Sequence, residues 1–323
     1  MPFLPVGGQA VIEGVMMRSP SRIAVAVRRG DGSLGYLERP FVSITRRVPV
    51  LGWPVIRGAV SLFETLYLGI TALNFSADEA TRDEAAPASG DEAVPASAAA
   101  RKPSPLASVA QGATILFSLA LGILLFVVLP ARVTSWLGFH DRIGFGLVDG
   151  GFRLLAFVLY LLLISQWKEL RRVLMYHGAE HKAIHALEHR APLTPESVQT
   201  FSRLHPRCGT SFLFLVIVVS IVVFTFIGRP QNLGQHLLRI ACMPLIAGVA
   251  FEFIRISGKY ADRPVVRWLV WPGMQFQRLT TREPDLSMCA VAIAALERVR
   301  GDEIVVALER AGDAARADVA FVQ

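Results

Sequence analysis

Residues 209–228 read GTSFLFLVIVVSIVVFTFIG and contain no charged side chain. A helix needs about 20 residues, at about 1.5 Å each, to cross the ~30 Å hydrocarbon layer of a bilayer. The run therefore predicts a transmembrane helix. Residues 103–131 predict a second one, because they also lack charge around the apolar core ILFSLALGILLFVVL and end beside the helix breaker Pro130.

Two further apolar segments carry charge near their ends. Residues 152–167 contain Arg153, which is close enough to one end for its charged head to reach the membrane interface. Residues 237–256 contain Arg239 near one end and Glu252 with Arg255 near the other. Together with the two uncharged runs, they predict four transmembrane helices within residues 106–257.

The composition of the whole chain agrees with a membrane protein. Of its 323 residues, 53% are hydrophobic and only 18% are charged, whereas soluble domains carry about 25% charged residues. No RRM, zinc-finger or helix-turn-helix pattern accompanies the net charge of +7, so we expect no nucleic-acid partner. Three widely spaced cysteines exclude a disulfide framework. We expect a mainly α-helical integral membrane protein, with the lipid bilayer as its main partner.

Basic residues in the loops predict the orientation of these helices. The loop 168–209 carries seven Lys and Arg residues, and residues 255–282 carry six. Residues 131–153 and 229–239 together hold only five. We therefore expect the 168–209 loop and both chain termini to lie in the cytoplasm, with the protein in the cell membrane.

Residues 1–54 predict a small β-rich cytoplasmic region. The runs QAVIEGVMM, IAVAVRR and LGYLERPF are rich in β-forming residues, and the turn GDGS separates the last two. Residues 55–75 have a helical period but contain Arg57 and Glu64. They predict an amphipathic helix that lies in the membrane interface rather than crossing the membrane.

Two segments complete the chain. Residues 76–105 are rich in Ala, Pro, Ser, Asp and Glu, which predicts a disordered linker. Residues 258–323 predict a C-terminal cytoplasmic or interfacial helical region, with a short interface helix over 263–273 and an amphipathic helix over 286–312.

The loop after the second predicted span holds most of the residues that can carry chemistry. The stretch QWKELRRVLMYHGAEHKAIHALEH has a helical period, and its histidines recur every four residues as one stripe: His177, His181, His185 and His189. His177-Gly-Ala-Glu180-His181 matches the H-x-x-E-H pattern of inverted zincins. Two imidazoles one turn apart can bind one Zn²⁺. Glu180, about 100° around the helix axis from His181, is placed to act on a zinc-bound water as a general base.

A zinc hydrolase site needs a third protein ligand. Glu252 is one candidate, because the predicted topology places it at the cytoplasmic end of the fourth span; an ion pair with Arg255 is the alternative. Glu188, on the same stripe as the histidines, is another candidate. His205 and Cys208 in LHPRCGTSF are further possible ligands, because the neighbouring Pro and Gly predict a turn back toward the His helix.

Each of these features also has a simpler interpretation. The His stripe can belong to a polar helix on the membrane surface whose side chains are merely solvated. Cys208 can be an inert buried thiol at a helix entry. Gly7 and Gly8 predict a turn that opens a strand and needs no chemistry.

Several longer segments give the chain a wider resemblance. They are GGQAVIEGVMMR (7–18), ALNFSA (72–77), YHGAEHK (176–182), HPRCGTSF (205–212), FEFIRISGK (251–259) and, after a PG, QRLTTREPD (277–285). In this order they resemble the bacterial YqhQ-like family of multi-pass membrane proteins, described as predicted metal-dependent enzymes with a domain of unknown function. His185 and His189 lie outside its motifs. The resemblance implies that the family's motif positions are occupied here by His177, Glu180, His181, His205, Cys208 and Glu252.

Two function classes follow. The first is a membrane-embedded zinc-dependent hydrolase at the cytoplasmic membrane face. In it, His177, His181 and Glu252 hold the metal and Glu180 activates water, and the substrate is a lipid, a lipid-linked intermediate or a membrane-proximal peptide. The second is a non-catalytic metal-binding scaffold or regulatory protein whose β-rich part binds a partner. A transporter fits less well, because the predicted spans carry no acid in mid-membrane.

Overall fold

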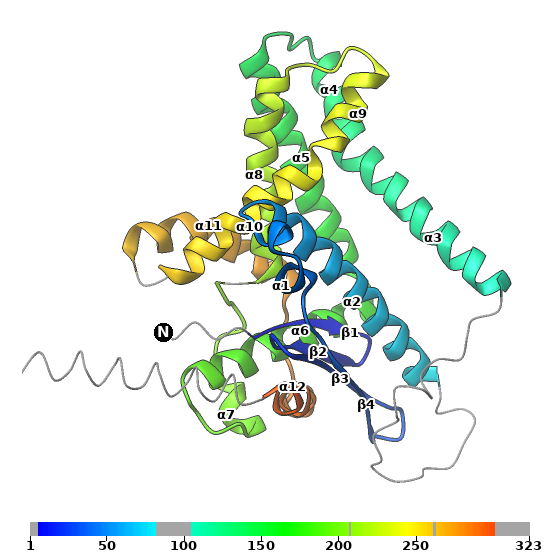
Figure 1. Ribbon diagram of the computed structural model, residues 1–323, viewed down its shortest axis with the longest axis vertical. Helices are drawn as coiled ribbons and strands as arrows, with labels where there is room; N and C mark the ends of the chain where they lie inside the picture. The colour runs from blue at the N-terminus through cyan, green and yellow to red at the C-terminus, as the bar shows by residue number, and fades with distance from the viewer. Residues whose placement is uncertain (1–5, 82–104, 207, 261–262, 301–323) are drawn as a thin grey trace, which may run out of the picture.

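A bundle of long apolar helices and a small sheet form two parts of the molecule (Figure 1). The computed structural model describes residues 6–81, 105–206, 208–260 and 263–300. In Figure 1 the long helices form the upper part, and the four-stranded sheet lies below them between helices. The predicted β-rich N-terminal region and the largely helical remainder are confirmed for the described residues.

The sheet is antiparallel, with its strands in sequence order: β1 (Gly7–Val11), β2 (Gly14–Arg18), β3 (Arg22–Arg28) and β4 (Leu34–Pro40). The run QAVIEGVMM, predicted as one strand, holds two, because the chain reverses at Ile12 and Glu13. Glu13 adopts the left-handed backbone conformation (φ 51°) that so tight a turn requires. The predicted GDGS turn joins β3 to β4.

Helices cover both faces of the sheet. On one face, α2 (Ile56–Thr81) packs Leu68, Ala72 and Phe75 against buried side chains of the strands. On the other face, α6 (Lys168–Glu188) and α12 (Leu286–Val299) supply most of a second core. Successive residues of β2 and β3 point alternately into the two cores, which is why both faces of these strands are apolar.

Two predicted segments differ in extent from the structure. Residues 76–81, expected to begin the linker, continue α2, and an ion pair of 2.6 Å between Glu79 and Arg29 holds this end of the helix to the sheet. Residues 82–104 of the predicted linker lie outside the described residues. The amphipathic helix predicted over 286–312 is described over residues 286–299, where its apolar side packs in the second core.

Within the described residues, five helices are long and apolar enough to cross a membrane, rather than the four predicted: Ile56–Ala80, Gly112–Trp136, Arg142–Ile164, Gly209–Ile227 and Leu233–Ser257. The additional one belongs to α2, which was expected in the interface because of its charges. Both charges are paired. Arg57 binds Glu252, and Glu64 accepts hydrogen bonds from the Ser43 hydroxyl (2.9 Å) and the Ile44 N–H (2.7 Å). Such pairing lowers the cost of placing charges in an apolar helix.

The first predicted span continues past its proline. α3 (Pro105–Ile123) runs through a π-helical turn, η3 (Leu124–Val128), into α4 (Leu129–Trp136), so Pro130 does not end the helix. The wider π turn before Pro130 lets the helix continue although proline cannot donate a backbone hydrogen bond.

The remaining elements are α1 (Ile44–Arg47), η1 (Pro49–Gly52), α5 (Arg142–Ile164), α7 (Pro195–Gln199), α8 (Gly209–Ile227), α9 (Leu233–Ala241), α10 (Met243–Lys259) and α11 (Pro264–Thr280).

A cluster of buried charges joins α5 to α9. Asp149 pairs with Arg153 (3.0 Å) and with Arg239 (3.2 Å), and none of the three is more than 4% exposed. Arg153 therefore does not reach the interface as predicted; its guanidinium lies over the ring of Phe224 inside the bundle. α5 begins at residue 142 instead of 152, which brings the acidic Asp149 into an apolar helix. The argument against a transporter, which relied on the lack of such an acid, does not hold.

The turn between β1 and β2 carries an ion pair whose contribution to stability depends on pH. Glu13 accepts hydrogen bonds from Arg172 and from the Tyr176 hydroxyl, both on α6. These bonds, that of Arg172 above all, hold the pKa of the Glu13 carboxyl below its ordinary value of 4.5. Because the folded-state pKa is the lower one, the stabilisation is complete above the unfolded pKa and is lost as the pH falls through the folded pKa.

We expect Glu13→Gln to lower the free energy of unfolding at neutral pH by about 1 kcal/mol. The difference from the wild type should disappear at acidic pH, where the wild-type carboxyl is protonated as well. Thermal unfolding of both detergent-solubilised proteins across a pH series measures this. A loss of equal size at every pH would show that the charge of Glu13 is not the cause.

Candidate metal centre

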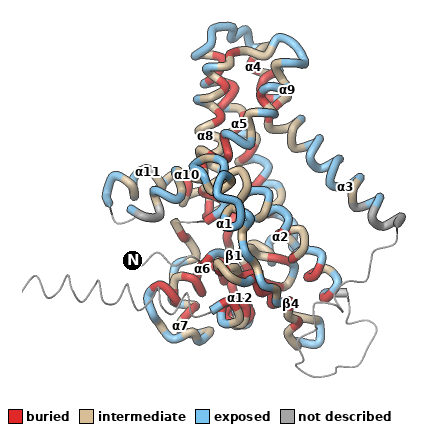
Figure 2. The backbone as a smooth tube through the Cα atoms, in the orientation of Figure 1, coloured by how far each residue is buried: buried red, intermediate tan, exposed pale blue. Residues whose placement is uncertain are grey.

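The helix α6 is polar in sequence and largely buried in the structure (Figure 2). Its most buried polar side chains, each at most 6% exposed, are those of Glu180, His181, Lys182 and Glu188. Burying a charged group to this degree is costly unless partners compensate for the lost water. Lys182, for example, donates to the Gln199 carbonyl (2.7 Å) and pairs with Glu283 (2.5 Å). The polar side of α6 therefore faces other parts of the chain rather than water.

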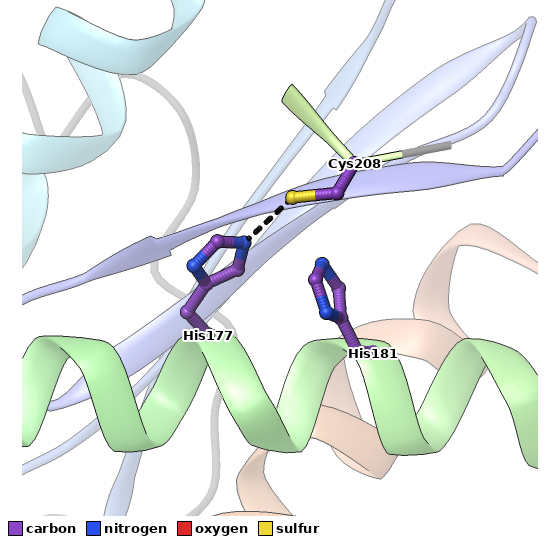
Figure 3. A group of neighbouring side chains, drawn as sticks. All are labelled: His177, His181 and Cys208. Atoms are coloured by element: carbon purple, nitrogen blue, oxygen red, sulfur yellow. Dashed lines mark hydrogen bonds between the residues drawn. The ribbon is translucent and has the colours of Figure 1, made fainter. Parts of the chain in front are cut away.

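Three potential metal ligands meet at this helix (Figure 3). His177 and His181 project from consecutive turns of α6, and Cys208, the N-cap residue of α8, faces them. We call these three residues the first cluster. Their ligand atoms all lie within 4.8 Å of one another, and His177 Nε2 is 3.3 Å from Cys208 Sγ.

The geometry and the donor types of the first cluster fit zinc. Two bonds of about 2.0–2.3 Å at a tetrahedral angle place their ligand atoms roughly 3.5 Å apart, so only a small contraction is needed. Two imidazoles and a thiolate are soft and borderline donors that suit Zn²⁺. A three-ligand set also leaves a fourth position for water or substrate, as in catalytic rather than structural zinc sites.

Backbone carbonyl groups fix the orientation of both imidazoles. His177 Nδ1–H donates to the Thr280 carbonyl (2.7 Å), and His181 Nδ1–H donates to the Arg203 carbonyl (2.6 Å). Each bond sets the tautomer and leaves Nε2 as the nitrogen that can bind a metal. Metal-binding histidines in proteins are commonly held in this way by the second ring nitrogen.

The side chains of the first cluster change one another's protonation. Burial alone would raise the pKa of the Cys208 thiol, but His181 and His177 outweigh burial and hold that pKa well below its ordinary value. Burial alone would lower the pKa of His177, but Cys208 outweighs it and the pKa of His177 rises to about 9. Cys208 is therefore favoured as a thiolate, the form that binds metals and acts as a nucleophile.

Glu180 is buried beside the first cluster and is only 4% exposed. Among the residues that the structure describes, its Oε2 has no hydrogen-bond partner. Burial raises the pKa of the Glu180 carboxyl, although His177 and His181 act in the opposite direction. A buried carboxyl with a raised pKa next to candidate metal ligands is suited to accept and return a proton.

A second cluster lies one turn further along α6. His185 and Glu188 from α6 and His205 from the segment before α8 bring their ligand atoms within 4.8 Å of one another. Burial and a neighbouring imidazole lower the pKa of His185 and of His205 to about 4. The rings of His181 and His205 are 5.7 Å apart, so the two clusters are neighbours. His189, the last histidine of the stripe, belongs to neither cluster.

The predicted third ligands thus have different locations. Cys208 joins the two zincin-type histidines, whereas His205 and Glu188 belong to the second cluster. The turn predicted around Pro206 and Gly209 does bring both His205 and Cys208 back to α6.

Glu252 lies outside both clusters, so its predicted role as a ligand is not supported by the geometry. It accepts hydrogen bonds from the Arg57 guanidinium and from the Val55 N–H (3.3 Å). Arg57, and not the predicted Arg255, is its hydrogen-bonded partner. The reason is that α2 packs along α10, a contact that the sequence did not reveal.

Two further residues support the clusters and were not singled out from the sequence as such. Gln277 is fully buried and holds the backbone of His205, since its side-chain oxygen accepts from the His205 N–H (2.7 Å) and its amide donates to the His205 carbonyl (2.6 Å). A Cβ atom at Gly8 would lie 2.9 Å from the side chain of Glu180. Gly8 is therefore a close-packing residue rather than merely a strand opener. The only sequence signal for Gln277 and Gly8 was their place in the QRLTTREPD and GGQAVIEGVMMR segments.

A pocket of about 560 Å³ opens onto Cys208. Its lining comes from the sheet, from the segment around α1 and from α2, α8 and α10. Large apolar side chains in its wall are Phe41, Leu62, Phe212, Phe251 and Ile254. Its basic side chains are Arg18, Arg46 and Arg255. The first cluster is therefore bordered by a cavity that combines apolar walls with positive charge.

The fold and the clusters define a multi-helix, membrane-type protein with a buried group of His, Cys and Glu side chains on a polar helix. Residues 53–302 match the family described as "Protein of unknown function (DUF1385)", and the chain belongs to that family. The chain is also 32% identical over 296 residues to the uncharacterized protein YqhQ of Bacillus subtilis (strain 168), a match that covers 89% of each chain. No solved structure matches the chain. The family resemblance is confirmed, whereas the enzyme class stays a prediction.

Replacing Gly8 should disturb the neighbourhood of Glu180 without removing a ligand. A methyl group at position 8 would meet Glu180 and come within 2.7 Å of the Met16 carbonyl oxygen, whereas one at position 7 would meet nothing within 4 Å. We expect Gly8→Ala to reduce stability by about 1–3 kcal/mol, and Gly7→Ala to leave it unchanged. Thermal unfolding of the two variants side by side measures this, and equal stability of both would contradict the packing role of Gly8.

Proposed function

We propose that the protein is a metal-dependent hydrolase whose zinc site lies on α6, next to the membrane. The observation that carries the proposal is the first cluster, in which His177, His181 and Cys208 converge and both rings are anchored by backbone carbonyl groups. In this proposal Cys208 takes the place that the sequence had suggested for Glu252.

The residues around the cluster support a hydrolytic reaction. A Zn²⁺ ion held by His177, His181 and Cys208 would supply Lewis acidity for the hydrolysis. Glu180 is the residue that would take up the proton of the attacking water and pass it to the leaving group. The burial of Glu180 supports this role, because a raised pKa eases the return of the proton.

The pocket supports an amphiphilic substrate with an anionic headgroup. Its arginines suit a phosphate or a carboxylate, and its apolar walls suit an acyl chain. Three of the helices that line it are long and apolar enough to cross a membrane, so such a molecule can enter from the bilayer. Because Cys208 lies in the wall, the reactive end of the substrate would lie beside the metal ligands. We therefore favour a lipid or a lipid-linked intermediate over a peptide.

The orientation in the membrane is part of the proposal. The segment 168–209, which contains α6, holds seven Lys and Arg residues and residues 255–282 hold six, whereas residues 131–153 and 229–239 together hold five. Basic loops remain on the cytoplasmic side of the cell membrane. We therefore place α6, the sheet and both chain termini in the cytoplasm. Because the sheet packs on α2 with one face and on α6 with the other, this placement requires that four of the five long apolar helices cross the membrane and that α2 stays on the cytoplasmic side.

A thiol hydrolase is a second candidate, because Cys208 and His177 also form a nucleophile–base pair. The two side chains are 3.3 Å apart, and the Thr280 carbonyl orients the imidazole. Cys208 also caps the N-terminus of α8, where the helix dipole favours a thiolate. In this alternative, Cys208 attacks the substrate itself. A non-catalytic metal-binding scaffold or regulatory protein is the remaining alternative, which keeps the metal ligands but has no turnover.

Metal content and turnover together separate these functions. We expect His177→Ala and His181→Ala to lose the zinc of the first cluster, because each removes one of three protein ligands. Glu180→Gln should keep the zinc but slow hydrolysis of a short-chain anionic lipid ester by roughly 10²-fold or more, because an amide cannot accept the proton. Elemental analysis of the tag-free, detergent-solubilised protein and a product-release assay give the two readouts.

His140→Ala is the control. His140 lies before α5, contacts Arg229 and belongs to neither cluster, so this variant should keep both its metal and its turnover. Release of zinc by Glu180→Gln would contradict the general-base role. Turnover that survives a chelator but not Cys208→Ala would favour the thiol hydrolase. Zinc binding without turnover of lipid esters would favour the scaffold.

Substitutions of arginine test whether the pocket binds an anionic headgroup. Arg46 lines the pocket, whereas Arg47, the next residue, does not. We expect Arg46→Gln to weaken binding of a short-chain phosphatidate about 3- to 10-fold, the loss of one charge-assisted contact of about 1 kcal/mol. Arg47→Gln should leave it unchanged, and an uncharged short-chain diacylglycerol should bind both variants equally. Calorimetric titration measures this, and similar effects of both substitutions would contradict recognition of the headgroup within the pocket.

A further inference from the structure

The second cluster is not used by the proposed hydrolase, yet its geometry is that of a metal site. His205 Nε2 lies 3.3 Å from Glu188 Oε2, and His185 Nδ1 lies 3.9 Å from the same oxygen. Two atoms bound to one zinc ion through bonds of about 2.0–2.1 Å are roughly 3.4 Å apart. Small movements of these side chains would therefore complete three bonds to one ion.

The donors of the second cluster are also oriented from outside it. His185 Nε2–H donates to the Leu204 carbonyl (2.9 Å), which leaves Nδ1 facing Glu188. His205 is held through its backbone by the buried side chain of Gln277. Anchoring of one ring nitrogen by a carbonyl group is the same arrangement as in the first cluster and is common among metal-binding histidines.

Burial and helix geometry add to this argument. His185 and Glu188 are three residues apart on α6, so their side chains share one face of the helix. The side chains of Glu188 and His205 are at most 5% exposed, and that of His185 is 12% exposed. A divalent cation here would place positive charge beside a buried carboxylate, which favours the ionised form of that carboxylate.

We propose that the second cluster binds a second divalent metal ion, adjacent to the first cluster. The rings of His181 and His205 are 5.7 Å apart and those of His185 and His205 are 4.6 Å apart, so the two ions would be neighbours along α6. Two imidazoles and a carboxylate suit Zn²⁺ and other first-row divalent metals, whereas the thiolate of the first cluster favours zinc. This site goes beyond the proposed function and does not depend on its being correct, because it uses none of the ligands of the first cluster.

The metal-to-protein ratio tests the proposal. Tag-free, full-length protein in detergent is stripped with a chelator, incubated with Zn²⁺, separated from free metal and analysed by mass spectrometry for zinc. We expect about two equivalents in the wild type and about one in His185→Ala and in Glu188→Gln, because each removes a ligand of the second cluster alone. His189→Ala, the next histidine along the same stripe, is the matched control and should keep about two.

Loading the protein with Co²⁺ in place of Zn²⁺ shows which of the two clusters has lost its ion. Co²⁺ bound to a thiolate shows an intense sulfur-to-metal charge-transfer absorption, which imidazole and carboxylate ligands do not produce. We expect Glu188→Gln to keep this absorption at full intensity while it loses one equivalent of cobalt. Cys208→Ala should lose the absorption and keep the ion of the second cluster.

The outcomes distinguish this site from the proposed function. A single zinc that is lost in His181→Ala and kept in Glu188→Gln overturns the second site and leaves the hydrolase proposal intact. A single zinc that is kept in His181→Ala and lost in Glu188→Gln supports the second site and contradicts the hydrolase proposal. A folded wild type that binds no zinc overturns both. Glu188→Gln preserves the shape of the side chain, and its thermal unfolding in the metal-free form, compared with that of the wild type, shows that metal loss is not a consequence of misfolding.

Discussion

The burial of a polar helix is the constraint on which the rest of this structure depends. α6 turns His181 and Lys182 away from water and leaves His177 only partly exposed, and buried polar groups must find partners inside the protein. The partners come from segments that are distant in sequence, such as the carbonyl groups of Arg203 and Thr280. To supply them, the chain after α7 and the end of α11 must both fold against α6. The same contacts that satisfy the helix thereby orient its imidazoles for metal binding.

This arrangement joins two kinds of environment. On one side of α6, the sheet and α12 form an apolar core with it. On the other side, Cys208 caps the N-terminus of the apolar helix α8. The first cluster is completed only where these parts meet, and the pocket beside it is lined from both. Under the proposed function, bilayer molecules would reach a site in this position through the pocket, and water would reach it from the cytoplasmic side. Hydrolysis of a membrane-embedded substrate requires both.

Charges inside the apolar helices follow the same rule as those on α6. A hydropathy profile counts each charged residue as unfavourable in an apolar helix, because the profile contains no information on partners. Two such pairs are Arg57 with Glu252 and Asp149 with Arg239. In the structure each is neutralised by a partner from another helix, so the cost of burial is much smaller than for an isolated charge. Such pairing explains how the long apolar helices α2 and α5 can carry these charged residues.

The sequence by itself determined the local features of this protein: the apolar runs, the hairpin at GDGS, and the placement of His177 and His181 on one face of one helix. These follow from periodicity and chain geometry over a few residues. Only the tertiary structure decided which side chain joins those histidines. Glu252 was expected there from topology, but the packing of α2 against α10 pairs it with Arg57, and the turn before α8 brings in Cys208 instead. Contacts between distant segments depend on how whole elements pack, and the pattern of any one segment does not contain that information.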